Sequence, residues 1–406
     1  MPEDQTTWLS RLLAPFRRIT GSGAFIAEID GLRFVAIGSV LLFHLAVGLE
    51  IKSPAHFARP AGSLAADLVY NGFRGVELFF VISGFILAMP FAGHGLLGKP
   101  AVSLKSYFLR RVTRLEPPYV LCMILLFGMH VLFRGRSARE LFPHLCASLV
   151  YLHNLIYSAE SPINNVTWSL EIEIQFYVLT PFLAALFLIK GKALRRSVIS
   201  ALCAISVVLG WLFIEPNGRA YYSILRFLHF FLVGFLLADV YLTDWKGKPT
   251  RGWLWDVIAF VGWPLLFLSW SGTATPLPGQ APGREPLQTV LLVPAAVFLL
   301  YCAAFRGRAA NRIFVNPLVT TIGGMCYTIY LLHNPALALI VSWTRGLGTT
   351  GSYAIDLVVQ ALAVFPILFV PCAAYFLLVE KPCMSRDWPK RLWRRISSGR
   401  PALTPR

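Results

Sequence analysis

The sequence is poor in charged residues, which make up only 14% of its 406 positions. Soluble globular domains usually carry about 25%. Hydrophobic residues account for 56% of the chain, and the mean hydropathy is +0.62. These values exclude a soluble globular protein and a disordered chain. They predict an all-α membrane helix bundle that crosses a lipid bilayer several times.

Acidic residues are scarcer than basic ones, because 20 Asp and Glu stand against 37 Lys and Arg and leave a formal net charge of +17. The basic residues are grouped in short blocks between apolar runs. Such blocks are typical of the cytoplasmic loops of membrane proteins. We therefore expect no nucleic-acid partner.

The seven cysteines lack the close pairing of a metal site or a disulfide framework. They are scattered singly, and most lie inside apolar runs, where a thiol behaves as a small hydrophobe. We expect no metal centre.

Eleven apolar runs have lengths close to those that a bilayer core demands. They cover approximately residues 33–49, 74–92, 117–133, 141–157, 171–189, 197–214, 221–242, 253–270, 287–305, 318–343 and 353–379. Successive loops are alternately rich and poor in Lys and Arg, and the basic loops are expected to be cytoplasmic. This pattern predicts that both termini lie in the cytoplasm. Two cytoplasmic termini need an even number of crossings, so we expect about ten transmembrane helices.

One run within 117–157 is therefore expected to be re-entrant or buried in the bundle. The run 141–157 is the better candidate, because His144, His153 and Asn154 make it the more polar one. The alternative is that the charge bias fails in one loop.

We divide the chain into an N-terminal segment (1–30), a transmembrane domain (31–380) and a basic cytoplasmic tail (381–406). Residues 8–19 mix apolar and basic side chains, so they form either an interfacial helix or a disordered tail. Residues 271–286 are rich in Gly and Pro and are expected to form an outer loop.

Ionisable side chains inside the predicted spans are few, and they are functional candidates because burying them in a bilayer is costly. Arg33 and His44 lie eleven residues apart in the first span. On a helix this spacing gives about 16 Å of rise and about 20° of departure from three whole turns. The two side chains therefore share one stripe, which suits a long substrate with an anionic head and a reactive tip. The alternative is a histidine whose hydrogen bonds are satisfied by a neighbouring helix.

A further span opens with two carboxylates. Glu171 and Gln175 share one face of the expected helix, whereas Glu173 and Tyr177 share another. At most one of the two carboxylates is therefore expected to belong to a site. Both can instead be residues at the helix start, where negative charge suits the helix dipole.

Other intramembrane candidates are Glu77, near the end of a span, and His333. Arg111 and Arg114 lie one turn apart if they are helical, and they can then grip a phosphate with forked hydrogen bonds. The alternative for this pair is a basic cluster that only sets the topology.

Together these segments resemble the acyltransferase 3 family of integral membrane O-acyltransferases. The matching features, in chain order, are Asp30-Gly31-Leu32-Arg33 with His44, the Gly75–Phe85 segment, the Arg111-x-x-Arg114 pair, the Thr167–Tyr177 segment, the Tyr327–His333 segment and Glu380-Lys381-Pro382. The family usually reads Glu-Glu-Gln-Phe-Tyr where this chain reads Glu-Ile-Gln-Phe-Tyr at 173–177. Glu173 therefore aligns with the first family carboxylate, and Glu171 is the reserve candidate.

The resemblance implies an O-acyltransferase of the bacterial inner membrane. Such an enzyme moves an acyl group, commonly acetyl, from acyl-CoA at the cytoplasmic side to an acceptor hydroxyl. Acyl-CoA is then a co-substrate, and we expect no permanently bound cofactor. The expected acceptors are a carbohydrate, a lipid-linked sugar or a glycosylated metabolite.

The resemblance also implies roles for particular residues. His44 is the expected general base, because an alcohol must lose its proton while it attacks a thioester, and Glu173 is expected to assist. Arg33, Arg111 and Arg114 are expected to hold the CoA phosphates. Residues expected to bind substrate or support the site are Asp30, Glu77, Trp168, Gln175, Tyr177 and His333. Direct transfer is preferred over a covalent acyl-histidine.

A different class of function would also explain buried ionisable residues in such a bundle. A secondary transporter or flippase for a glycan or glycosylated metabolite is the alternative. Against it, the sequence shows no evident pair of broken spans and no inverted repeat.

Overall fold

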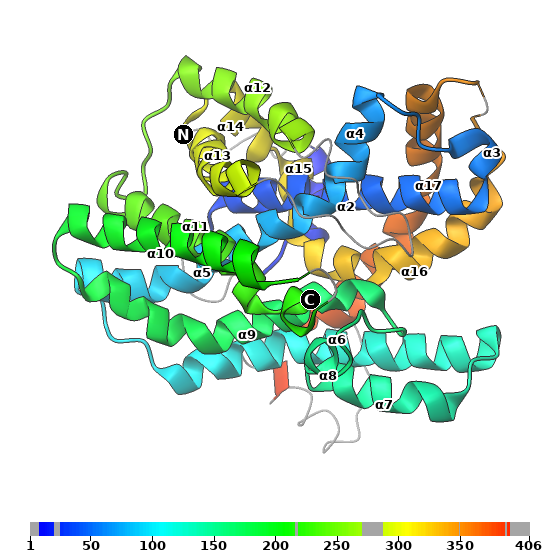
Figure 1. Cartoon of the computed structure of the whole chain (residues 1–406), viewed down its shortest axis with the longest axis horizontal. Coiled ribbons are helices and arrows are strands. Elements are labelled where there is room, and N and C mark those ends of the chain that lie inside the picture. Colours follow the sequence, from blue (N-terminus) through cyan, green and yellow to red (C-terminus); the bar gives the residue numbers. More distant parts are fainter. Residues whose placement is uncertain are drawn as a thin grey trace.

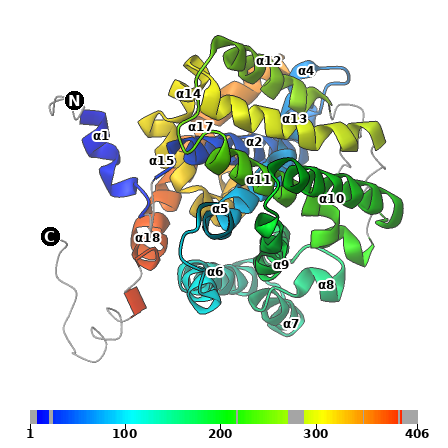
Figure 2. The same ribbon diagram turned by 90° about the vertical axis from the view of Figure 1, so that its left-hand side faces the viewer.

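The computed structural model describes residues 8–19, 25–215, 218–269, 287–348, 350–385 and 388–389. Within these ranges every regular element is a helix, in agreement with the predicted all-α class. Many of the helices run alongside one another (Figure 1), and a second view shows α5, α6 and α9 nearly end-on (Figure 2). The expected outer loop 271–286 and most of the tail 381–406 lie outside the described residues.

The helices range from single turns to the 31 residues of α6. Up to residue 167 they are α1 (Trp8–Leu13), η1 (Ala14–Phe16), α2 (Ala27–Lys52), α3 (Pro54–Phe57), α4 (Leu64–Tyr70), η2 (Asn71–Arg74), α5 (Gly75–Leu97), α6 (Leu104–Arg134), α7 (Ala138–Leu149), α8 (His153–Tyr157) and η3 (Asn165–Thr167). From residue 168 they are α9 (Trp168–Leu183), η4 (Ala184–Leu188), α10 (Lys192–Phe213), η5 (Arg219–Tyr222), α11 (Ile224–Thr243), α12 (Trp253–Ser269), α13 (Leu287–Arg306), α14 (Ala309–Phe314), α15 (Pro317–Gly324), α16 (Cys326–Thr344), α17 (Tyr353–Tyr375), η6 (Phe376–Glu380) and α18 (Lys381–Cys383).

Helix boundaries follow from local chemistry. The Ser103 side chain accepts a hydrogen bond from the backbone N–H of Ser106 and so caps the start of α6. Gly98 ends α5 and Gly135 ends α6, both with φ near +60°. Glycine adopts this left-handed conformation without the steric cost of a Cβ.

Seven helical segments among the described residues are long and apolar enough to cross a membrane. They are Ala27–Lys52, Leu64–Leu97, Leu104–Arg134, Asn165–Leu188, Lys192–Phe213, Ala220–Thr243 and Tyr353–Cys383. The pair Pro317–Gly324 and Cys326–Thr344, bent by 70°, gives an eighth if it forms one span. Two further apolar helices, Trp253–Ser269 and Val290–Arg306, are shorter. The chain is thus a multi-pass membrane protein, whereas ten crossings and two cytoplasmic ends stay predictions.

The run 141–157, predicted to be re-entrant or buried, forms the short helices α7 and α8 and is not among these candidate spans. The two histidines that make it polar face each other, with His144 Nδ1 2.8 Å from His153 Nε2. The run 318–343 also differs from a simple span, because the bend at Met325 divides it into α15 and α16.

Glycines let the central helices touch backbone to backbone. A Cβ placed on Gly84 of α5 would lie 2.2 Å from the carbonyl oxygen of Phe231, and one on Gly234 of α11 would come equally close to α5. A Cβ on Gly75 would lie 2.3 Å from the carbonyl oxygen of Ala36 in α2. Small residues at helix crossings are typical of membrane bundles. These contacts fix α5 between α11 and α2, the helix that carries Asp30, Arg33 and His44.

Two described segments that are far apart in the sequence, residues 15–19 and 381–384, pack together. Lys381 Nζ donates to the Pro15 carbonyl, and the backbone N–H of Ile19 approaches Met384 Sδ at 3.4 Å. Figure 2 shows α1 and α18 on the same side of the bundle. Residues 8–16 are helical, as one of the two sequence interpretations requires; their contact with a membrane surface stays a prediction.

Candidate active site

A buried carboxylate organises two arginines at the start of α2. Asp30 is 1% exposed. Its Oδ1 accepts a hydrogen bond from Arg33 Nη1 and its Oδ2 accepts one from Arg18 Nε, both at 2.7 Å. The close approach of α15 depends on Gly323, where a Cβ would lie 1.8 Å from the Asp30 carbonyl oxygen. The sequence pattern did not include Arg18, which belongs to the mixed segment before the first span.

Further guanidinium groups lie near this carboxylate. Burial, followed by the positive charge of Arg33, lowers the pKa of Arg18 to about 10, and the charge of Arg114 acts in the same direction. Arg114 Nε is buried and makes no hydrogen bond. We call Arg18, Arg33, Arg111 and Arg114 with Asp30 the Asp30 cluster. It unites the three arginines that the sequence assigned to donor binding and adds a fourth.

Arg111 joins this cluster through aromatic rings of α6 and α9. Its guanidinium lies 3.6 Å from the ring centroid of Tyr107 and 5.4 Å from that of Tyr177. Tyr177 in turn donates a hydrogen bond to Glu173 Oε1 at 2.7 Å, and Ser83 of α5 donates to the same oxygen at 2.6 Å. Tyr177 therefore links Glu173 to Arg111.

The neighbouring polar residues of α9 point elsewhere. Glu171 Oε2 accepts a hydrogen bond from the backbone N–H of Asn154 near the start of α8, and Gln175 Oε1 accepts one from that of Ile224 at the start of α11. Both satisfy N–H groups that a helix start leaves without intrahelical partners. Trp168 accepts a hydrogen bond from Asn154 Nδ2 at its backbone carbonyl. Glu171 and Gln175 thus anchor helices, and the two carboxylates face different surroundings.

His44 lies against a second histidine. Its ring centroid is 5.0 Å from that of His333 on α16. His333 is fully buried, and its Nδ1 lies 2.8 Å from the carbonyl oxygen of Tyr330 and 3.1 Å from that of Ile329. Two carbonyl acceptors assign the proton to Nδ1. The buried Nε2 then carries a lone pair, and no hydrogen-bond partner is present for it.

Contacts between α16 and the start of α9 hold His333 in place. Tyr330 donates to the Val166 carbonyl, and its hydroxyl lies 3.0 Å from Ser169 Oγ. Asn164 Nδ2 donates to the Leu331 carbonyl at 2.9 Å. The partner of His44 is therefore fixed on a rigid element.

Two further carboxylates lie at helix boundaries. Glu77 pairs with Arg74, at 2.8 Å between Arg74 Nη1 and Oε1, where α5 begins. Glu380, 1% exposed, accepts hydrogen bonds from the backbone N–H and the hydroxyl of Thr328 in α16. Glu380 therefore ties η6 to the helix that carries His333.

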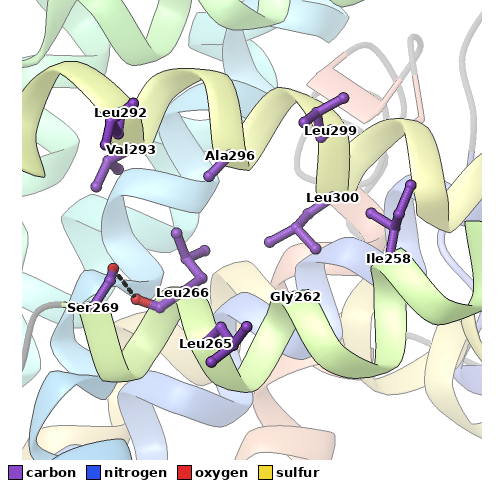
Figure 3. Close-up of a pocket in the computed structure, with 10 residues that line it drawn as sticks. All are labelled: Ile258, Gly262, Leu265, Leu266, Ser269, Leu292, Val293, Ala296, Leu299 and Leu300. Atoms are coloured by element: carbon purple, nitrogen blue, oxygen red, sulfur yellow. Dashed lines mark hydrogen bonds between the residues drawn. The ribbon is translucent and has the colours of Figure 1, made fainter.

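The cavity in Figure 3 lies between α12 and α13 and has a volume of about 360 Å³. It is lined by Ile258, Gly262, Leu265, Leu266, Ser269, Leu292, Val293, Ala296, Leu299 and Leu300. Ser269 donates its hydroxyl proton to the Leu266 carbonyl. A lining without titratable groups offers no acid–base chemistry, so we assign no catalysis to this groove. Among the residues that the structure covers, no group of three or more His, Cys, Asp or Glu could hold a metal ion.

A family model described as an acyltransferase domain matches residues 26–377. The chain is 29% identical over 236 residues to a putative peptidoglycan O-acetyltransferase, YrhL, of Bacillus subtilis, which covers 53% of this chain and 33% of that protein. It is 24% identical over 342 residues to a putative O-acetyltransferase of Staphylococcus aureus strain COL, covering 79% of this chain and 52% of the relative. It is 23% identical over 365 residues to the O-acetyltransferase OatA of Staphylococcus aureus, with coverages of 84% and 55%.

This chain thus spans between one third and about half of the length of these curated relatives. No solved structure matches it.

Proposed function

The chain belongs to the acyltransferase family whose model matches residues 26–377, and from this membership we propose that it is an O-acyltransferase. In this proposal it moves an acyl group, acetyl in the first instance, from acyl-CoA to a hydroxyl of a carbohydrate-containing acceptor. The observation that carries the proposal is the pairing of His44 with His333, whose buried Nε2 has no hydrogen-bond partner. The names of the relatives support acetyl as the group and a glycan as the acceptor class.

The Asp30 cluster is the proposed binding site for the phosphates of acyl-CoA. Guanidinium groups suit this task because their forked N–H donors match phosphate oxygens. Asp30 pins Arg18 and Arg33, while Arg111 and Arg114 make no ion pair within the described ranges. The helical rise of about 16 Å from Arg33 to His44 is comparable to an extended pantetheine arm, so the thioester would lie near the imidazole.

His44 is the proposed general base. His333 Nε2 has no hydrogen-bond partner in the structure, so in this proposal it is free to accept an N–H from one ring nitrogen of His44 during the reaction. The other ring nitrogen of His44 then accepts the proton. The acceptor oxygen attacks the thioester carbonyl carbon while His44 takes the hydroxyl proton. The carbon–sulfur bond then breaks, and the proton passes from the imidazolium to the departing CoA sulfur. Base catalysis of this kind contributes typically 10²–10⁴-fold in rate.

Glu173 has a supporting role in this proposal. Its hydrogen bonds to Ser83 and Tyr177 and the proximity of Tyr177 to Arg111 favour positioning of the donor-binding arginine. In this proposal His333, and not Glu173, orients the imidazole of His44. A transporter would also account for buried charges, but the family membership and the named relatives favour group transfer.

The proposal is tested with purified protein in lipid nanodiscs, acetyl-CoA labelled in the acetyl group, and soluble peptidoglycan or polysaccharide fragments. We expect label in the acceptor for the wild type and none for His44→Ala. His56→Ala is the matched control, because His56 is an exposed histidine on the short helix α3, and it should retain activity. Undiminished acylation by His44→Ala removes this residue from the mechanism.

The donor site is tested by Arg111→Ala combined with Arg114→Ala. We expect the KM for acetyl-CoA to rise, because charged hydrogen bonds to phosphate are lost. Arg110→Ala is the control, since this exposed neighbour donates only to the Ser106 carbonyl. If the KM for acetyl-CoA is unchanged in the double variant, Arg111 and Arg114 do not bind the donor and act only as a basic cluster that sets the membrane topology.

A further inference from the structure

A second set of charged side chains collects where α5 and α11 begin, outside the site assigned above. The crossing of these helices at Gly84 and Gly234 lies about two turns beyond Glu77 on α5 and Arg226 on α11. Phe80, one turn after Glu77, packs against Phe227 with ring centroids 5.2 Å apart. Glu77 and Arg226 therefore lie at the same level of neighbouring helices.

The charges in this set do not cancel. Arg74 and Glu77 form an ion pair in which both side chains are less than 9% exposed. Arg226 lies over the ring of Tyr221 at 3.7 Å and over that of Phe227 at 4.9 Å. No carboxylate of the described ranges forms an ion pair with Arg226. Arg226 is half-buried, and a partly desolvated guanidinium without an ion-pair partner is well suited to bind a negative group supplied by a ligand.

Glu77 offers an open acceptor beside this cation. Its Oε1 is used by Arg74, but Oε2 is buried and makes no hydrogen bond. Leaving a buried carboxylate oxygen without a hydrogen bond is unfavourable. A ligand hydroxyl would satisfy it.

Half-buried aromatic rings surround the same point. The ring centroid of Trp168 lies 5.7 Å from that of Tyr222 and 5.6 Å from that of Phe227. Tyr221 and Tyr222 meet edge to face at 5.2 Å. Rings with exposed apolar faces and polar tips suit a sugar, whose C–H faces pack on them while its hydroxyls reach polar groups.

Ring contacts connect this set to His44. The Arg74 guanidinium lies 4.7 Å from the ring centroid of Phe73. Phe73 is 5.6 Å from Phe43, and Phe43 is 4.9 Å from His44, in both cases between ring centroids. Three successive contacts of about 5 Å thus separate this set from the imidazole, a span that an oligosaccharide can bridge, whereas the Asp30 cluster approaches His44 along the stripe of α2.

We propose that Arg74, Glu77, Trp168, Tyr221, Tyr222 and Arg226, the Arg226 cluster, form the acceptor subsite and select a saccharide that carries an anionic group. This rests on the proposed function. Arg226 pairs with a carboxylate or phosphate of the saccharide, Glu77 Oε2 accepts one of its hydroxyls, and the rings hold its apolar face. The presented hydroxyl then lies toward His44.

The test compares three acceptors in the nanodisc assay: a tetrasaccharide containing glucuronate, its carboxyl-reduced neutral form, and a phosphate-bearing disaccharide. We expect the KM of the wild type for the uronate or the phosphate form to be at least about 10-fold below that for the neutral form. Arg226→Gln should raise the KM for the charged acceptor by about the same factor. It should leave the KM values for the neutral acceptor and for acetyl-CoA unchanged.

Two further variants make the result specific. Arg226→Lys keeps the charge without the fork and should fall between the wild type and Arg226→Gln; it also replaces Arg226→Gln should that variant not fold. Arg345→Gln is the control for charge loss, since Arg345 is exposed and bonds only to the Lys52 carbonyl. Equal wild-type KM values for charged and neutral acceptors, or equal increases in Arg226→Gln, overturn the proposal.

Binding without donor separates this proposal from the proposed function. Saccharide binding is followed by the tryptophan fluorescence of the nanodisc-bound protein, with the same three probes. Anion-selective binding that Arg226→Gln abolishes, without acyl transfer, upholds the subsite and refutes the transferase assignment. Acyl transfer with equal KM values for charged and neutral acceptors upholds the transferase assignment and refutes the anion-selective subsite.

Discussion

Replacing Asp30 by Asn tests whether the Asp30 cluster depends on its central carboxylate. The side chain is 1% exposed and accepts from Arg18 and Arg33 at 2.7 Å. An asparagine keeps the shape, but one acceptor oxygen becomes an NH2 group that faces a guanidinium. Breaking a buried ion pair by changing one partner costs about 3–5 kcal/mol. The arginine side chains are 10% and 15% exposed, so we expect a loss at the lower end, about 3 kcal/mol.

The assay is unfolding of the detergent-solubilised protein, measured with the KM for acetyl-CoA. Asp30→Asn should unfold more easily and should raise this KM, because Arg33 loses the partner that orients it. Asp67→Asn is the control, since Asp67 pairs with Arg59 at 3.0 Å but is 21% exposed. Such a pair is worth at most about 1 kcal/mol. If both variants unfold alike and keep the wild-type KM, the carboxylate does not organise the site.

The effect should not depend on pH between 6 and 9. The pKa of Arg18 is lowered, chiefly by burial, from its usual value to about 10. A basic group with a lowered folded pKa penalises folding while it is protonated, and this penalty is relieved only as the pH rises above about 10 toward the pKa of the unfolded chain. Arg18 therefore stays charged throughout the assay range. A KM ratio between Asp30→Asn and the wild type that changes within that range would contradict this account.

Two further predictions concern other parts of the bundle. His333→Gln should lower kcat by about 10–100-fold with little change in the KM for acetyl-CoA, because His44 loses the partner that orients it. The pH–rate profile should also shift. If His333 has a purely structural role, the pH–rate profile of the folded fraction will be unchanged. Asp239→Asn should destabilise the fold by about 3–5 kcal/mol, since Asp239 is fully buried between Arg195 and Arg196. Asp244→Asn should cost less than about 1 kcal/mol, because this second partner of Arg196 is 30% exposed. Hydrogen bonding to Arg196 lowers the pKa of Asp244 to about 2. The stability that Asp244 contributes is therefore present above pH 3.8 and is lost as the pH falls toward 2. Equal destabilisation by Asp239→Asn and Asp244→Asn would contradict this comparison.

Hydropathy was sufficient to find the helices, because each of the eleven apolar runs coincides with helical structure. It could not find the bend at Met325. That bend accompanies the packing of α15 on α2, where Gly323 meets the Asp30 backbone. Long-range packing of this kind has no periodic signal in a single sequence. The division of 141–157 into two helices was anticipated only in part, through its polar histidines.

The candidate site divides in the same way. Spacing within one helix predicted that Arg33 and His44 share a stripe, and that Glu171 and Glu173 point apart. Contacts between helices that are distant in the sequence could not be predicted from spacing. The sequence therefore identified His333 as a candidate but not its proximity to His44. Arg18 was missed for a different reason, because a basic residue outside the spans looks like any other topology signal.

The hydrogen bond from Lys381 to the Pro15 carbonyl has a consequence for biosynthesis. Arg18 lies three residues beyond Pro15, and Glu380 directly precedes Lys381. The contact therefore joins two segments that are made 366 residues apart in synthesis, and the earlier segment carries Arg18 of the proposed donor site. A nascent chain that has inserted its first several helices still lacks this closure, so activity should arise only once synthesis has passed residue 381. We expect a rigid fusion partner inserted near Pro15 or near Lys381 to lower activity more than the same partner inserted in a loop between two helices.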